Sequence, residues 1–187
     1  MTSFHLNTRD LTPQFVEELQ KRFPSAELAI QVGEALPTSD FTDDDFWNVI
    51  ARLDWSKEAD DQAVLQPAVQ YLASLPLSGI YRFADMLSEK LWQLDTAAHA
   101  RVFLEEDGQQ GDLSVDDFLY ARCCVVANGK EVWQNVLSHP EQMPTEVTFE
   151  PLLHIVSAAY RLKTGKDQLI VPAYNYETYS NKAGWEK

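Results

Sequence analysis

The sequence predicts a mainly α-helical protein, a multi-helix domain with a small β-α-β unit at its N-terminus. Apolar residues recur every three or four positions over most of the chain, which is the spacing of one helix face. Two of these segments follow a Ser or Thr with an acidic residue three positions later, a common way for helices to begin. The chain has 187 residues, 45% of them hydrophobic, enough for one domain with a small appendage to build a packed core.

The β-α-β unit is expected over residues 1–36. Residues 3–6 and 28–32 have the composition of short strands, although their pairing is left open. Between them, Thr12 is expected to cap a helix whose first position is Pro13. Three residues one turn apart give this helix an apolar face: Phe15, Leu19 and Phe23.

The helical domain is expected over residues 43–187, after a linker at residues 33–42 that contains Gly, Pro, Ser and Thr. Thr42 with Asp45 starts the first helix. Pro67 is expected either to kink the second helix or to mark its first turn. The apolar positions of these two helices are Phe46, Ile50 and Leu53, then Val64, Leu65, Val69 and Leu72.

The longest apolar stripe predicts a third helix, capped by Ser78. Its members are Ile80, Phe83, Leu87, Leu91 and Leu94. A short fourth helix is expected from Thr96 to Phe103, and an acidic loop at residues 105–111 leads to the next helix, which starts at Ser114. That helix ends at Asn128 and Gly129, residue types that adopt the left-handed conformation readily. A short helix around Trp133 and a last one from Thr148 to Leu162 complete the domain.

The C-terminal tail differs in character from the helical domain. Residues 169–171 can form a final strand that joins the opening unit. Residues 161–187 carry five basic side chains against three acidic ones, on a chain whose formal net charge is −14. The tail is also aromatic, with Tyr174, Tyr176, Tyr179 and Trp185. We expect it either to lie on the acidic body or to reach a partner.

The strong negative charge restricts the classes of partner. It repels phosphate groups, so direct binding to nucleic acid or to an anionic membrane is not expected. The two cysteines, Cys123 and Cys124, are neighbours and cannot build a disulfide framework, which indicates a reducing compartment. Neither a signal peptide nor a run of about 18 apolar residues occurs. We therefore expect a cytoplasmic protein that does not cross a membrane.

No metal ion and no cofactor are expected. Residues 106–117 resemble a calcium loop in one glycine, one apolar residue and a final carboxylate, but Gly108 and Gln110 stand where ligands are needed. The four histidines form no HExxH motif, and no GxSxG elbow or glycine-rich phosphate loop occurs. Both cysteines lie in an apolar helix, where a buried, inert thiol is the ordinary outcome.

Arg122 is the one charged residue that draws attention, because it lies inside an otherwise apolar helix. A charge there usually has a partner, and Asp95 and Asp117 are candidates for a structural ion pair. The alternative is a binding site. If the chain is an enzyme, its site is assembled from distant residues, and the candidates are Asp95, His99, Tyr120, Arg122 and Asn128.

Several separated motifs, in order, resemble the bacterial domain-of-unknown-function family 4240. The longest runs from Phe118 to Lys130, and others are Phe46-Trp47, Leu53-Asp54-Trp55, and Lys90-Leu91 with Leu94-Asp95-Thr96. The tail from Tyr176 to Trp185 fits too, so the resemblance covers residues 43–187. The resemblance implies a mostly helical fold, and it supplies no established activity or catalytic residue to carry over to this chain.

These observations favour a non-catalytic protein-binding or regulatory module in a bacterial cytoplasm, whose partner is another protein of basic character. An immunity or antitoxin role is a specific form of this hypothesis. The alternative is an enzyme with a site around Asp95, His99 and Arg122. A second alternative is an acidic mimic of nucleic acid.

Overall fold

The computed structural model describes residues 4–5, 12–24, 41–57, 59–106, 113–167 and 169–186. This part of the chain is mainly α-helical, as the sequence predicts. The helices are α1 (Pro13–Arg22), α2 (Asp43–Ile50), α3 (Asp61–Ser74), α4 (Leu77–Gln93), α5 (Ala97–Glu106), α6 (Val115–Ala127), α7 (Lys130–Ser138), α8 (Ile155–Thr164) and α9 (Lys182–Trp185). Short 3-10 helices η2 (Trp55–Lys57), η3 (Pro140–Gln142) and η4 (Glu150–His154) and strands β1 (Phe4–His5) and β2 (Leu169–Ile170) connect them.

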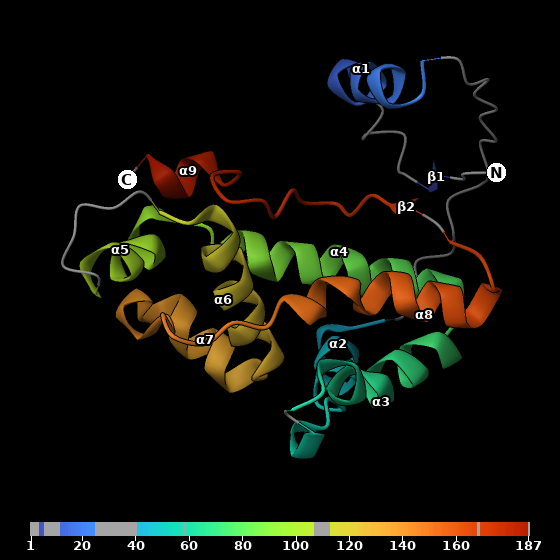
Figure 1. Cartoon of the computed structure of the whole chain (residues 1–187), viewed down its shortest axis with the longest axis horizontal. Coiled ribbons are helices and arrows are strands. Elements are labelled where there is room, and N and C mark those ends of the chain that lie inside the picture. Colours follow the sequence, from blue (N-terminus) through green and yellow to red (C-terminus); the bar gives the residue numbers. More distant parts are fainter. Residues whose placement is uncertain are drawn as a thin grey trace.

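Helix α4 is the axis of the body. It lies along the long dimension of the molecule, with α8 beside it, α2 and α3 on one side, and α5, α6 and α7 gathered at its C-terminal end (Figure 1). Apolar side chains from these helices form one core, in which the rings of Phe46 and Phe83 stack with their centroids 4.8 Å apart. Burying one such side chain contributes about 1.5–3 kcal/mol.

The predicted helix starts are largely confirmed. Thr42 and Asp45 form a full capping box at α2, and the Ser114 hydroxyl accepts a bond from the Asp117 amide at α6. Gly129 follows α6 with a φ of 98° and precedes α7, a conformation that disfavours any residue with a Cβ. Pro67 lies inside α3, so it does not mark the first turn.

Two boundaries differ from the expectation. Helix α4 begins at Leu77 after Pro76, so Ser78 is its second residue and not its cap. The last long helix was expected from Thr148, but a 3-10 helix with Pro151 near its start comes first, and α8 begins only at Ile155. Proline fixes its own φ and lacks an N–H, so it suits such a first turn.

The predicted β-α-β unit at the N-terminus is not supported. Strand β1 pairs in parallel with β2, with Phe4 opposite Leu169 and His5 opposite Ile170, so its partner comes from the far end of the chain. The other predicted strand, residues 28–32, lies outside the described residues. Helix α1 is confirmed, with Thr12 as its cap and Pro13 at its start, but it has no buried residue. A two-residue strand joined to a C-terminal partner does not make a βαβ motif.

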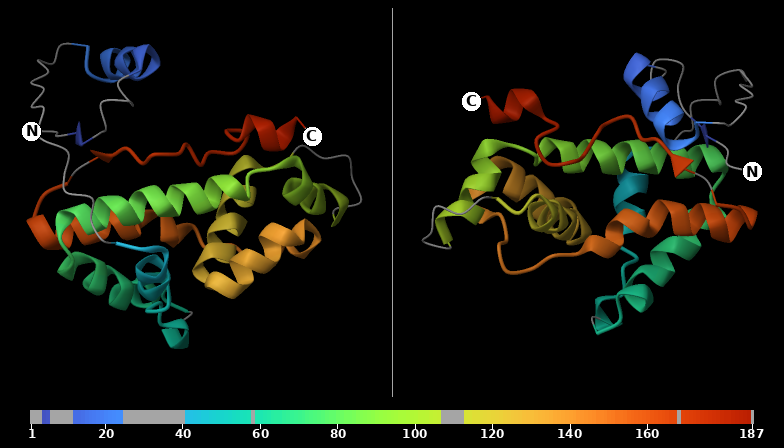
Figure 2. Two further views of the ribbon diagram at one scale, coloured as in Figure 1. Left: turned by 180° about the vertical axis from the view of Figure 1, so that it is seen from behind. Right: turned by 45° about the horizontal axis from the view of Figure 1, so that its top comes forward.

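The segment after β2 runs back over the body in an extended conformation. It follows α4 towards α5 and ends in α9, and both further views show the same course (Figure 2). We call residues 173–186 the C-terminal strap. No helix in the described part of the chain is long and apolar enough to cross a membrane.

Candidate functional site

The strap lies along one face of α4. The Ala173 amide donates to Asp85 Oδ1 (2.9 Å) and the Tyr174 amide to Ser88 Oγ (3.3 Å). The Tyr174 ring packs on the Trp92 ring, with centroids 5.3 Å apart. Asp85, Ser88 and Trp92 are spaced by three and four residues, so they form one stripe on the helix.

Asp95, just beyond the end of α4, is the main anchor of the strap. Its side chain is completely buried, and four groups of the strap donate to its two oxygens. The amides of Tyr179 and Asn181 lie at 3.1 and 2.9 Å, Ser180 Oγ at 3.2 Å and Trp185 Nε1 at 2.9 Å. Hydrogen bonds to a charged acceptor are the strong class, which is why a buried carboxylate is tolerated here.

Arg122, on α6, is the second anchor and is also completely buried. Its Nη1 donates to the carbonyls of Leu91 (3.1 Å) and Tyr176 (2.9 Å). Its Nη2 donates to Thr178 Oγ1 at 2.9 Å. The guanidinium therefore joins α4, α6 and the strap through a fork of fixed geometry.

The two buried charges do not form the predicted ion pair. Within the described part of the chain, no salt bridge connects Arg122 to Asp95 or to Asp117. Burial lowers the pKa of Arg122, and the negative charge of Asp95 opposes that shift. Each charge instead takes its close partners from polar groups of the strap and the helices, which the sequence pattern did not indicate.

His99 lies at the α5 end of the strap and is 3% exposed. Its Nδ1 lies 2.7 Å from Thr96 Oγ1 and its Nε2 lies 3.1 Å from the Val136 carbonyl, so it ties α5 to α7. Burial lowers its pKa, so the neutral imidazole is favoured. A Cβ added to Gly184 would come within 2.7 Å of Thr96 Cγ2, which shows how closely α9 sits against this turn.

The two remaining enzyme candidates, Tyr120 and Asn128, lie on α6 and at its C-terminal end. The Tyr120 carbonyl accepts a bond from the Phe149 amide at 3.0 Å. Asn128 is exposed and donates to the Cys124 carbonyl at 2.9 Å, which caps the end of α6. The structure thus brings Asp95, His99 and Arg122 to the same end of the body, while Asn128 bonds within its own helix.

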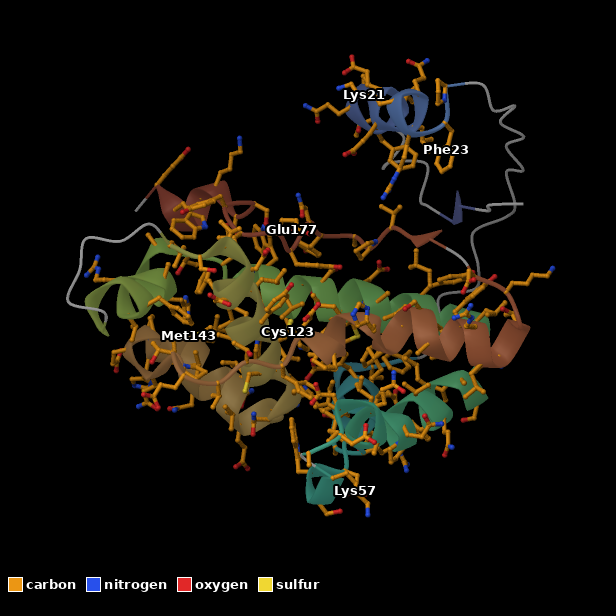
Figure 3. The ribbon with its side chains drawn as sticks, in the orientation of Figure 1. Lys21, Phe23, Lys57, Cys123, Met143 and Glu177 are labelled. Carbon is orange, nitrogen blue, oxygen red and sulfur yellow. The ribbon has the colours of Figure 1, made fainter. Side chains whose placement is uncertain are left out.

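The cysteines are buried and free. Burial raises the pKa of the Cys123 thiol to about 12, so it is protonated at neutral pH and a poor nucleophile. Figure 3 shows Cys123 among the helices and Glu177 on the strap above them. No group of three potential metal ligands occurs among the residues that the structure describes.

One shallow groove on the surface lies elsewhere, between α3 and α8. It is lined by Gln66, Val69, His154, Ser157, Ala158, Arg161, Leu162 and Asp167. None of the five residues proposed for an enzyme site contributes to it.

Sequence reasoning expected the tail to lie on the body or to reach a partner, but it assigned no contact to the individual residues of the strap that meet Asp95, Arg122 and Thr96. These strap residues are Thr178, Ser180, Asn181, Gly184 and Trp185. The spacing of Tyr174, Tyr176 and Thr178 is a signal of an extended segment with one face on the body. These residues occur at every second position, and the residues between them are exposed. Ser180-Asn181 before Lys182 also has the composition of a helix cap, and Asn181 does cap α9.

The fold and the site define a class of protein: a helical domain closed by an extended C-terminal strap over two buried charges. The chain belongs to the DUF4240 family, described as a protein of unknown function, whose model matches residues 41–162. The N-terminal region and the strap lie outside that match, although Asp95 and Arg122 lie inside it. No curated protein and no solved structure matches the chain.

Proposed function

We propose that this protein is a non-catalytic protein-binding or regulatory module of a bacterial cytoplasm. One observation carries the proposal: the buried polar groups that an enzyme would need are already bonded to the protein itself. Asp95 and Arg122 are completely buried and hold the strap, and His99 holds two neighbouring helices. Groups bonded in this way stabilise the surface that the strap and the helices form together.

The charge distribution supports a partner of basic character. The formal net charge is −14, and residues 161–187 carry more basic than acidic side chains, so the rest of the chain holds all of the net negative charge. Such a body attracts cationic surfaces and accelerates encounter with them at low ionic strength. An immunity or antitoxin role is one form that this binding would take.

Affinity capture with the tagged full-length chain tests the proposal. At physiological ionic strength, extract of the native host should yield one protein in stoichiometric amount. The purified pair should then form a complex of fixed ratio that weakens as salt is raised. Recovery of no stoichiometric partner, or of metabolite-dependent turnover by the chain alone, contradicts the proposal.

A further inference from the structure

The strap is an intramolecular ligand of the helical body, bound to a surface built for an extended polypeptide. Along residues 173–180, partly buried positions alternate with exposed ones, as in a strand with one face on a receptor. The receptor consists of Asp85, Ser88, Trp92, Asp95 and Arg122. All of them except Arg122 lie on α4 or directly after it.

The receptor recognises features that many extended chains can offer. Asp85, Ser88 and Asp95 accept from main-chain amides of the strap, and Arg122 donates to one main-chain carbonyl and one hydroxyl. Two further contacts require a large side chain: the Trp185 indole donates to Asp95, and the Tyr174 ring packs on Trp92. Main-chain bonds supply affinity and a few side-chain contacts supply selectivity, as in other peptide-binding surfaces.

We infer that this surface is where the partner docks, and that the partner is a cationic protein that inserts an extended segment in place of the strap. This inference rests on the proposed function. Charge supports the choice of a cationic protein, since the chain that carries the surface has a formal net charge of −14. A second copy of this chain would bring the same negative body with it and is repelled.

Two substitutions separate the strap from the receptor. A substitution at Gly184 loosens the strap, and a substitution at Asp95 alters the receptor directly. A methyl group at Gly184 would meet Thr96 Cγ2 at 2.7 Å, and the Thr96 side chain is held by its bond to His99. Gly184→Ala therefore weakens the contact of the strap with Thr96 and changes none of the five receptor residues. Gly79→Ala is the matched control, because its Cβ would lie at an ordinary 3.4 Å from Leu75 Cβ.

A synthetic peptide with the sequence of residues 169–187 serves as the probe, added to the ¹⁵N-labelled full-length chain. The Trp185 indole resonance reports its bond to Asp95, and the Trp133 indole, which donates to the Lys90 carbonyl at 3.3 Å, is the internal reference. A tethered segment has an effective concentration of roughly millimolar, so millimolar peptide should shift the Trp185 resonance of the wild type. Gly184→Ala should need about tenfold less peptide, because the strap loses binding free energy comparable to that of one good hydrogen bond. Gly79→Ala should need as much peptide as the wild type.

The receptor is tested with a fluorescent form of the peptide. It should bind Gly184→Ala and fail to bind the double variant Gly184→Ala/Asp95→Asn, whereas Gly184→Ala/Glu131→Gln, which loses an exposed charge on α7, should bind like the parent. Equal binding to both double variants overturns the inference. So does an unchanged Trp185 resonance in wild type and Gly184→Ala at millimolar peptide. If Gly184→Ala loses the Trp133 reference signal and is unfolded, Trp185→Phe, which lacks the indole that bonds to Asp95, replaces it as the loosened strap in the fluorescent-peptide assay.

The captured partner separates this inference from the function on which it rests. We expect it to bind Gly184→Ala about tenfold more tightly than the wild type and to lose binding with Asp95→Asn. A partner that binds all three equally leaves the protein a binding module but places the docking surface elsewhere. Absence of any partner refutes the proposed function, whatever the peptide does.

Discussion

Buried charge is stabilised in two different ways near the C-terminal end of α4, on the side that faces α2 and on the side that carries the strap. At the α2 side, Lys90 is 7% exposed, bonds to Asp43 at 2.6 Å and lies within 5.1 Å of the ring centroids of Phe46, Trp47 and Trp133. At the α5 end, Asp95 and Arg122 find their close partners among polar groups of the strap and the helices. The first cluster ties helices of the body together, while the second ties the C-terminal strap to the body.

The two clusters also differ in their access to water. The Asp43 side chain is 45% exposed, and Lys130 reaches its other oxygen at 3.0 Å, so Asp43 keeps a partner if Lys90 is lost. Burial opposes the ionised form of Asp43, but the bonds from Lys90 and Lys130 prevail and lower its pKa. Asp95 and Arg122 are completely buried. Loss of a partner should therefore cost more under the strap than at Lys90.

The largest expected effect is that of Arg122→Met. The substitution keeps the apolar stem but removes the charge and leaves the carbonyls of Leu91 and Tyr176 without their donor. We expect the free energy of unfolding to fall by about 3–5 kcal/mol, measured by urea denaturation. Arg122→Lys should recover part of this loss, because lysine keeps the charge and lacks the planar fork. If Arg122→Met lowers the free energy of unfolding by less than about 1 kcal/mol, as a substitution at an exposed position would, Arg122 is not an anchor of the strap.

Asp95→Asn should have a somewhat smaller effect, about 2–3 kcal/mol. One oxygen of the amide still accepts, without charge, whereas the NH2 group that replaces the other oxygen cannot accept from the two donors there. The damage should be local. Amide hydrogen exchange should accelerate at residues 179–181, whose amides and hydroxyl bond to Asp95, more than in α4. Uniform acceleration in both segments would show that the strap and the core open together.

The helices of the body could be predicted from the sequence better than the contacts between the body and the C-terminal strap. Helix periodicity, Thr42, Ser114 and Gly129 act within a few residues, so local rules find them. The bond between Arg122 and Tyr176 joins residues 54 positions apart, and no local rule specifies it. Arg122 was marked by its charge in an apolar helix, but its partners are a carbonyl and a hydroxyl, groups that every chain has in abundance.

The β1–β2 pairing shows the same limit. A strand was expected at each of the two places, and the possibility that they meet was noted, but the period-2 pattern of a two-residue strand is too short to choose a partner. The β-α-β expectation followed from sequence proximity. The observed pairing instead joins the two ends of the chain, which only the packing of the whole body can determine.

Lys90→Met should cost less than either change under the strap, about 1–2 kcal/mol. Methionine fills the space between the rings, and Asp43 retains Lys130 and the Trp47 indole, which donates to it at 2.9 Å. Thermal unfolding of Lys90→Met and Asp95→Asn side by side measures the difference. If Lys90→Met is the less stable of the two variants, the loss of a charged group costs more at Lys90 than under the strap, contrary to the prediction.

The smallest expected effect is on pH dependence through His99. Its folded-state pKa lies below the ordinary value of 6.5 because the ring is buried, and the nearby positive charge of Arg122 adds to this. Below pH 6.5 the unfolded chain therefore binds a proton that the folded protein resists, so stability is fully present above 6.5 and declines as pH falls towards the folded-state pKa. His99→Gln keeps hydrogen-bonding capacity but does not titrate, so its stability deficit relative to wild type should narrow between about pH 7 and about pH 5. A constant deficit across that range, from urea denaturation at each pH, would show that His99 does not contribute to the acid sensitivity of the fold.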